Sequence, residues 1–441
     1  MFPSLGLLLK ERHGGLLDIG ARPDAHAAFD PDADLPFADR SVREVRLGDA
    51  VAALPVRDQV HLLMQCRRVL RHGAHVLCAE DGAAASYASL ARWAELVGLI
   101  DLAAPHAGQG WRKRDASTDA SPLVSILIPS ANPRYFSECL DSAIAQTYPR
   151  IEIVICDDCE TDAIGLQVAS RAGRAAIRYV KNPERLRARL NYQKCLSLAR
   201  GEYVKFLNDD DLLTPECVAT LLSGFLKVPD LVLATSHRWR INSDSQVIED
   251  MPATRPIVNR DLVIDGITLG NAMLMHGLNF IGEPSTAMFR RRDFDPRPHL
   301  DAEGPFHFNG AKGPGAIDMA MWARLLVQGN VAFFKKRLSR FRIHGEQAQA
   351  HPEMVARSIE GIRELQKQWI DLGLFRRFPP HLLWCQPLAR REVEADDWRA
   401  EAVGSLPSSM LRPDEAIRAW RAIRRHAFDV ARGVDSDPRS D

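Results

Sequence analysis

Acidic side chains stand at three points of the sequence where they could do chemistry. The run Asn208-Asp209-Asp210-Asp211 follows a short apolar stretch, Asp157-Asp158 follows another, and Asp318 begins a segment with a helical pattern. Adjacent carboxylates repel one another unless a cation neutralises them, and ligands that are all oxygen suit Mg²⁺ or Mn²⁺ shared with substrate phosphates. The run at 208–211 therefore predicts a metal-assisted phosphate site, with an acidic turn before a helix as the alternative.

The elements around these acids alternate between strands and helices. Runs rich in strand formers are followed by segments with helical periodicity, which predicts βαβ units in an α/β fold with a mostly parallel sheet. Open sheets of this kind bind ligands beyond the carboxyl ends of their strands, where both acidic runs stand. Thr214 and Pro215 predict a helix that begins directly after the second run. The expected strands lie at 123–130, 151–158, 176–180 and 203–207, and the expected helices at 135–146 and 187–199.

Composition bounds the class of protein. The 441 residues give room for two or three domains, and 57 basic residues balance 57 acidic ones, so net charge indicates neither a nucleic-acid nor a membrane partner. No apolar run approaches the roughly 20 residues that cross a bilayer, and the N-terminus lacks the pattern of a signal peptide. The eight scattered cysteines suit a reducing compartment, and the single CxxC at Cys156 and Cys159 is a weak zinc signal. We expect a cytoplasmic location, with peripheral attachment to a membrane left open.

The first 115 residues predict a small α/β domain. A strand at 16–20, a helix at 60–70 and a strand at 76–79 resemble a shortened class I S-adenosylmethionine-dependent methyltransferase. That family has a glycine-rich turn after its first strand, whereas Gly20-Ala21-Arg22-Pro23 holds one glycine and a proline, and Asp30 follows too closely for a full βαβ unit. We therefore expect a non-catalytic domain with a structural or docking role.

Four sequence pieces in order give a second resemblance. They are VSILIPSAN at 124–132, EIVICDD at 152–158, ARGEYVKFLNDDDLL at 199–213, and DMAMWARL followed by FRIHG at 318–345. Together, over about 122–347, they resemble a family 2 glycosyltransferase with the GT-A fold. The resemblance implies inverting transfer of a sugar from a nucleotide-diphosphate sugar, with a UDP-sugar favoured, to a glycan or lipid-linked acceptor in polysaccharide biosynthesis.

The same resemblance implies roles for individual residues. Asp318 matches the base that deprotonates the acceptor hydroxyl, and Asp158 matches the carboxylate that accepts a hydrogen bond from the nucleotide base. The implied nucleotide-sugar contacts are Pro129, Ser130, Asn132, Asp157, Asp158, Arg187, Asn208 and Asp209. The implied ligands of Mg²⁺ or Mn²⁺ are Asp209, Asp210, Asp211 and His344, with Asp210 foremost. Three positions depart from the family pattern. Ala131 stands where the family often has an aromatic residue, and Asn208 stands at the first acid of Asp-x-Asp. Ile317 stands where the family usually has a glutamate.

Other interpretations stay open. A nucleotidyltransferase uses a similar sheet but usually has, after its first strand, a loop rich in glycine and in basic residues. The segment 129–132 is not such a loop. A non-catalytic nucleotide-binding or scaffold protein would leave the acids as relics, Asp318 as a helix-dipole partner, Arg187 as part of a solvated basic face and His344 as structural. We further expect a linker at 104–121, a mobile lid at 301–315, where four glycines occur, and a helical region at 350–441.

Overall fold

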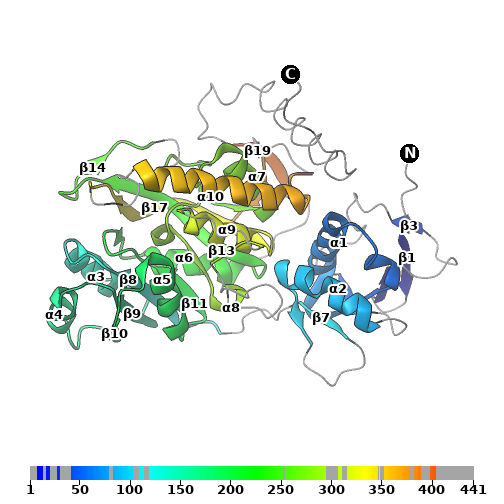
Figure 1. Cartoon of the computed structure of the whole chain (residues 1–441), viewed down its shortest axis with the longest axis horizontal. Helices are drawn as coiled ribbons and strands as arrows, with labels where there is room; N and C mark the ends of the chain where they lie inside the picture. Colours follow the sequence, from blue (N-terminus) through cyan, green and yellow to red (C-terminus); the bar gives the residue numbers. More distant parts are fainter. Residues whose placement is uncertain are drawn as a thin grey trace.

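The structure, a computed structural model, describes most of the chain up to residue 403. The described residues are 7–12, 16–19, 27–29, 41–78, 83–102, 109–113, 119–251, 254–294, 306–309, 315–345, 347, 352–376, 382–388 and 398–403. They form two domains side by side, an N-terminal domain within 7–113 and a central domain from 119 onward (Figure 1). Within these ranges, no helix combines the length and apolar character that a membrane crossing requires.

The described part of the N-terminal domain is a seven-stranded sheet with two α-helices and one short 3₁₀ helix. The strand order is β3-β1-β2-β4-β5-β7-β6, in which β2, β4 and β5 run parallel. Its strands are β1 (Leu7–Arg12), β2 (Leu16–Ile19), β3 (Ala27–Phe29), β4 (Val42–Leu47), β5 (Leu70–Cys78), β6 (Ile100–Asp101) and β7 (Gly110–Arg112). Its helices are η1 (Asp49–Val51), α1 (Val56–Val69) and α2 (Ala83–Leu96). Trp111 on β7 is fully buried, so this strand belongs to the domain core and the expected linker at 104–121 is in part a strand.

The central domain is built on a mixed sheet. The order is β10-β9-β8-β11-β16-β13-β17-β15-β18-β19, with β12 on β17 and β14 on β13. The strands are β8 (Val124–Ser130), β9 (Ile151–Asp157), β10 (Ile177–Lys181), β11 (Tyr203–Phe206), β12 (Leu212–Leu213), β13 (Leu231–Ile241), β14 (Val247–Ile248), β15 (Leu262–Ile264), β16 (Met288–Arg290), β17 (Asn330–Arg342), β18 (Leu382–Pro387) and β19 (Arg399–Ala402). The expected parallel strands are present from β10 to β11, but β16 runs antiparallel to both β11 and β13. The sheet as a whole is therefore mixed and not mostly parallel.

Helices cover both faces of this sheet. In β8, Ile126 and Ile128 belong to one apolar core, whereas Leu127, pointing the opposite way, belongs to the other. One face carries α3 (Phe136–Ile144), α4 (Ala163–Ala169) and α6 (Cys217–Lys227). The other carries α5 (Arg187–Leu198), α7 (Gly266–His276), α9 (Ile317–Leu326) and α10 (Pro352–Asp371). Three short helices complete the domain: η2 (Pro284–Thr286), α8 (Arg291–Phe294) and η4 (Leu374–Arg376).

Three local expectations differ from the structure or fall outside it. Leu212 and Leu213 do not open a helix: they pair with Ser339 and Arg340 of β17, and α6 begins at Cys217, because long-range strand pairing overrides the local capping signal. The C-terminal region is not only helical, since β18 and β19 follow α10 and extend the sheet beyond β15. Gly20, Asp30, the part of the expected helical region after residue 403 and most of the lid expected at 301–315 lie outside the described residues.

The two domains share one apolar core. Residues of α1, α2 and β7 belong to the same buried cluster as residues of α5, α7 and α9. At one edge of this contact, Arg92 of α2 donates a hydrogen bond from Nη2 to Asn309 Oδ1 over 2.7 Å. Asn309 in turn donates to Gln368 of α10 over 2.7 Å. The N-terminal domain is therefore docked onto the helices that cover one face of the central sheet.

Candidate active site

The carboxyl ends of three parallel strands meet at one edge of the central sheet. β8 pairs with β9 on one side and β11 on the other, so the order of the chain reverses at β8, the usual place for a ligand in an open α/β sheet. The turn 130–132 follows β8, Asp157 and Asp158 stand at the end of β9, and the run 208–211 follows β11. The expected convergence of both acidic runs at strand ends is confirmed.

Asp209 holds the turn that follows β8. Its Oδ2 accepts hydrogen bonds from Ser130 Oγ over 3.0 Å, from the backbone N–H of Ala131 over 2.7 Å and from that of Asn132 over 2.8 Å. Burial and the neighbouring charge of Asp210 raise the pKa of Asp209 to about 6, against the effect of these hydrogen bonds. These contacts fix the position of the turn 130–132.

Asp211 is fully buried and bonded within the fold. Its carboxylate accepts hydrogen bonds from Ser285 Oγ over 2.6 Å and from the backbone N–H of Arg342 over 3.0 Å. Asn208 Nδ2 donates to it over 3.3 Å, and burial raises its pKa well above the usual value. Because its oxygens tie β11 to η2 and to the end of β17, Asp211 is a poorer candidate for a metal ligand than Asp210.

Asp210 faces the chain segment that follows β17. Because β12, directly after the acidic run, pairs with β17, the segment after β17 lies beside the acidic run. Asp210 Oδ2 lies 3.1 Å from His344 Nε2 and accepts a hydrogen bond from Gln347 Nε2 over 3.1 Å, while Arg342 Nε donates to the backbone oxygen of Asp210 over 2.8 Å. Tyr135, at the start of α3, packs its ring against His344 and under the guanidinium of Arg342. The structure thus brings Asp210 and His344 together, as expected for two ligands of one ion.

The residues at the end of β9 join it to the start of α5. Asp158 accepts hydrogen bonds from the backbone N–H of Leu186 over 2.9 Å and of Arg187 over 2.7 Å, and from Asn182 Nδ2 over 2.8 Å. Arg187 is exposed and has a left-handed backbone, with φ of 63°. Such a conformation is costly for a residue with a Cβ and is held here by the bond to Asp158.

Asp157 is more deeply placed than Asp158. It is fully buried, and its carboxylate accepts hydrogen bonds from Tyr179 Oη over 2.7 Å, Lys181 Nζ over 3.2 Å and the backbone N–H of Cys159 over 2.8 Å. These contacts join β9 to β10, so the geometry favours a structural role for Asp157 over contact with a ribose.

Asp318 lies in the first turn of α9, half-buried. Its Oδ2 accepts a hydrogen bond from Asn279 Nδ2 over 2.7 Å, and its Oδ1 accepts one from the backbone N–H of Met319 over 2.8 Å. Burial raises its pKa, whereas these two hydrogen bonds oppose the rise. Ala316, not Asp318, is the N-cap residue of α9.

A buried ion pair lies in the loop that carries Asn279. Arg238 Nε is 3.0 Å from Glu283 Oε2, and Asp318 is among the charges that raise the pKa of Glu283, after burial. Gly282, with φ of 100°, permits this packing, because a Cβ there would stand 2.9 Å from Arg238 Nη1. The pair fixes the loop beside Asp318.

Tyr192 of α5 contacts the acidic run through Asn208. Its hydroxyl donates a hydrogen bond to Asn208 Oδ1, and its ring packs against Phe206 with centroids 4.8 Å apart. Burial raises its pKa well above the usual value, and the carboxylates that raise it further are, in order, those of Asp211, Asp210, Asp318 and Asp209. The loop 279–286 joins the acidic run to Asp318, because Asn279 donates to Asp318 and Ser285 donates to Asp211.

Sequence reasoning named neither Tyr192 nor Asn279 as a site residue. Both act through tertiary hydrogen bonds, and neither belongs to a short motif with a chemical signature.

A divalent ion fits this site as one shared with a substrate. Among the residues that the structure describes, no three His, Cys, Asp or Glu side chains come together as a metal-binding group. Asp210 and His344 nevertheless offer a carboxylate oxygen and an imidazole nitrogen side by side. Mg²⁺ and Mn²⁺ sites of nucleotide enzymes are often completed by substrate phosphates and water, so two protein ligands are sufficient.

Comparison with known proteins finds relatives of the central domain. Residues 125–295 match the family described as Glycosyl transferase family 2. The chain is 34% identical over 226 residues to an uncharacterized protein of Mycobacterium tuberculosis, covering 50% of this chain and 67% of that one. It is 33% identical over 137 residues to a hyaluronan synthase of Pasteurella multocida, and 32% over 142 residues to a chondroitin synthase of Escherichia coli. These matches cover 30% and 31% of this chain but only 14% and 20% of the two synthases.

One solved structure is distantly similar to this chain. The chain is similar to S. aureus TarS, crystallised in complex with UDP, at 16% identity and a TM-score of 0.39, over 57% of this chain and 69% of that one. A likeness this distant adds nothing about the substrate.

Proposed function

The central domain of this chain, over residues 125–295, belongs to glycosyl transferase family 2, and we propose that the chain transfers a sugar, with inversion, from a nucleoside-diphosphate sugar to an acceptor hydroxyl. The observation that carries the proposal is the loop 279–286, through which Asn279 bonds to Asp318 and Ser285 bonds to Asp211 of the acidic run. Such a transfer needs cationic help at the leaving diphosphate and a carboxylate at the acceptor, and this site holds candidates for both.

The donor nucleotide lies, in this proposal, between the turn after β8 and the start of α5. Pro129, Ser130 and Asn132 line one side with a turn that Asp209 fixes. Asp158 faces the other side and has acceptor capacity beyond its three present donors, since a carboxylate offers about four lone pairs. A uracil N–H could use that capacity, which supports UDP as the nucleotide. The exposed guanidinium of Arg187 would contact a phosphate.

Asp210 and His344 would hold the divalent ion, Mg²⁺ or Mn²⁺. The ion supplies Lewis-acid stabilisation of the leaving diphosphate when it is bound. Asp209 and Asn208 keep the turn and the acidic run in place around it, through the bonds to Ser130 and Tyr192.

Asp318 is the proposed base. Asn279 and the N–H of Met319 fix its carboxylate, so that one orientation faces the acceptor. Because burial raises its pKa, Asp318 is a stronger base than an exposed aspartate. The acceptor hydroxyl would pass its proton to this carboxylate as its oxygen attacks the anomeric carbon, and the nucleoside diphosphate would leave from the opposite side.

The similarity to synthases of hyaluronan and chondroitin supports an acceptor that is itself a glycan, free or lipid-linked, in polysaccharide biosynthesis. A cytoplasmic location agrees with the use of nucleotide sugars and is part of the proposal.

The test is a screen of nucleotide sugars against the full chain by thermal shift, with and without Mn²⁺, followed by chromatography of the products with glycan acceptors. Release of a nucleoside diphosphate together with a lengthened glycan would support the proposal. Release of pyrophosphate from a nucleoside triphosphate and a sugar phosphate would indicate a nucleotidyltransferase instead. The absence of both product sets, with nucleotide binding retained, would indicate a binding protein.

A further inference from the structure

A small pocket lies between the two domains, away from the proposed active site. Its lining comes from both domains, and the space it encloses is about 20 Å³. The lining residues are Arg67, His72, Gly98 and Lys113 of the N-terminal domain, and Pro229, Asp230, Val232, Arg290, Arg292, Asp293 and Gln328 of the central domain. Asp230 precedes β13, and Arg290 ends β16, which runs antiparallel to β13. The pocket therefore stands at the edge of the sheet opposite to the acidic run.

Positive charge exceeds negative charge in this pocket. Four permanently cationic side chains and His72 line it, against the carboxylates of Asp230 and Asp293. Asp230 Oδ1 is 3.3 Å from Lys113 Nζ and 3.5 Å from His72 Nε2. This one carboxylate therefore lies beside two basic side chains of the N-terminal domain. With His72 neutral, the lining carries a net charge of two positive units.

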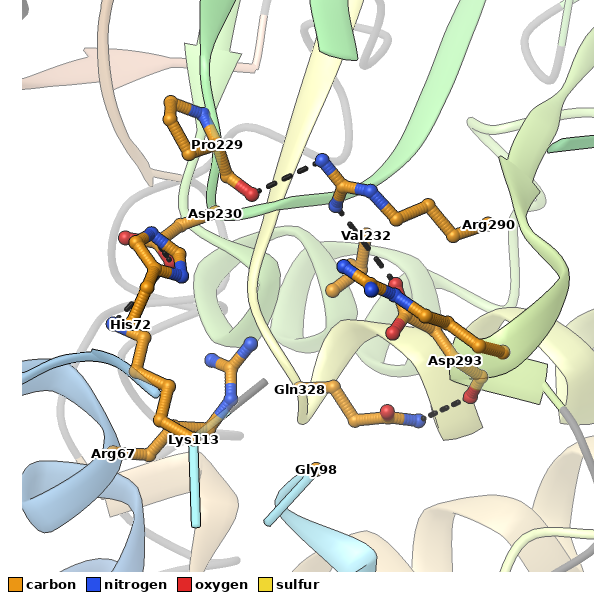
Figure 2. Close-up of a pocket in the computed structure, with 11 residues that line it drawn as sticks. Arg67, His72, Gly98, Lys113, Pro229, Asp230, Val232, Arg290, Asp293 and Gln328 are labelled. Atoms are coloured by element: carbon orange, nitrogen blue, oxygen red, sulfur yellow. Dashed lines mark hydrogen bonds and ion pairs between the residues drawn. The ribbon is translucent and has the colours of Figure 1, made fainter. Parts of the chain in front are cut away.

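Two arginines have donors that the protein leaves unused. Arg67 interacts with Asp230, Asp293 and Arg290 only through longer-range electrostatics: burial lowers its pKa most, the two carboxylates raise it and Arg290 lowers it further. Arg290 donates to the backbone oxygens of Pro229 and Leu231, but its Nε is buried with no hydrogen-bond partner. Figure 2 shows the Arg67 guanidinium directed toward the space between the domains, and that of Arg290 bonded to Pro229 and paired with Asp293, over 3.9 Å.

Such an arrangement is costly unless something offsets it. The unpaired, buried Nε of Arg290 and the net positive charge both carry a desolvation penalty. A space of this size holds a water molecule or a monatomic ion. Water would satisfy the donors but not the charge, whereas an anion would satisfy both.

We propose that this interdomain pocket binds a small inorganic anion, which Arg67 and Arg290 contact from opposite domains. Because each domain supplies one of these donors, the bound anion would stabilise the docking of the N-terminal domain on the central domain. The site is independent of sugar transfer and of the proposed metal ions.

The experiment measures the thermal unfolding of the full chain in sodium chloride and in sodium gluconate at equal ionic strength. Gluconate is too large for the space, so it controls for screening. In the wild-type chain, chloride should raise Tm relative to gluconate, by about 1–3 °C for each tenfold increase above its Kd. The same measurement in sodium phosphate tests whether an oxyanion binds at the mouth of the pocket.

The variants are Arg67→Met, which keeps an unbranched apolar stem without charge, and Arg43→Met, the same change at an exposed position of β4. Arg67→Met should lose the anion-dependent rise, and Arg43→Met should keep it. In gluconate, Arg67→Met should be at least as stable as the wild type, because it removes the cost of burying a charged group. Comparing variants is necessary for phosphate, since such anions stabilise proteins generally.

An equal anion response in the wild type and Arg67→Met, or no response in the wild type, would overturn the proposal. A second measurement does not depend on a variant. Wild-type crystals soaked in bromide should show an anomalous peak within hydrogen-bond reach of Arg67 and Arg290, and a pocket without such a peak would equally refute it.

Discussion

The side-chain amide of Asn279 donates to Asp318 Oδ2 over 2.7 Å and also to the backbone oxygen of Gly282 over 2.9 Å, while its Oδ1 accepts the N–H of Gly282. One side chain therefore joins the loop before η2 to the first turn of α9. Since this bond stabilises the ionised carboxylate, Asn279 is a positioning residue that also sets how basic Asp318 is.

The first prediction concerns pH. Removing the donor in Asn279→Ala should raise the pKa of Asp318 further above its usual value, because a hydrogen bond that lowers it is lost. The base would then be protonated at a higher pH, so the acid limb of the kcat/KM profile should move to higher pH. Asn279→Asp places a like charge beside the carboxylate and should move it further. The same acid limb in all three chains would contradict this role, whatever happens to overall activity.

The second prediction concerns Asp318 itself. Asp318→Asn keeps the shape and can still accept the N–H of Met319, but it cannot take a proton. Turnover at saturating donor and acceptor should fall by about 10²- to 10⁴-fold, the usual contribution of a general base. The dissociation constant of the donor should barely change, because the proposed base acts on the acceptor and not on the diphosphate. Near-normal turnover in this variant would remove Asp318 from the mechanism and direct attention to Glu283.

The parts of the site that follow from local pattern could be predicted from sequence. The ends of β8, β9 and β11 were recognisable because apolar runs stop at acids, and parallel strands bring such ends together. The role of each acid was not recognisable in this way. Asp209, Asp210 and Asp211 are adjacent in sequence, yet one holds a turn, one faces His344 and one is buried against Ser285.

The missed features depend on distant contacts. Leu212 and Leu213 became a strand because β17, more than a hundred residues later, pairs with them. The antiparallel strands after β11 follow from where the chain returns, which no local period records. The methyltransferase-like resemblance of residues 1–115 stays a hypothesis, since the matched family covers only the central domain.

The third prediction separates Asp210 from Asp211. Asp210→Asn removes a charged oxygen beside His344, so it should abolish the Mn²⁺-dependent gain in nucleoside diphosphate affinity and lower transfer more than about 100-fold. Asp211→Asn instead weakens bonds to Ser285 and Arg342 and should cost about 1–3 kcal/mol of stability. Its Mn²⁺ dependence should persist. Calorimetry with and without Mn²⁺, beside thermal unfolding, distinguishes the two, and a Mn²⁺ response retained in Asp210→Asn would exclude that residue as a ligand.

The fourth prediction uses the unusual backbone of Arg187. Arg187→Gly and Arg187→Ala both delete the guanidinium, but only glycine adopts a φ of 63° without strain. The glycine variant should therefore be more stable than the alanine variant by about 1 kcal/mol. If the guanidinium binds a donor phosphate, both variants should raise the donor KM alike, by about 10- to 100-fold, as expected for a lost hydrogen bond between charged groups.

Equal loss of donor affinity together with unequal stability is the result that identifies Arg187 as a phosphate ligand on a strained backbone. Arg185→Ala is the matched control, because Arg185 is exposed, lies two residues away and pairs only loosely with Glu160, at 3.5 Å. It should leave donor KM near the wild-type value, since surface ion pairs of this kind contribute little. If donor KM changed equally in all three variants, the effect would belong to the general positive potential of the helix start. If it changed in none, Arg187 would be part of a solvated basic face, and its backbone conformation would serve only to present the N–H that Asp158 accepts.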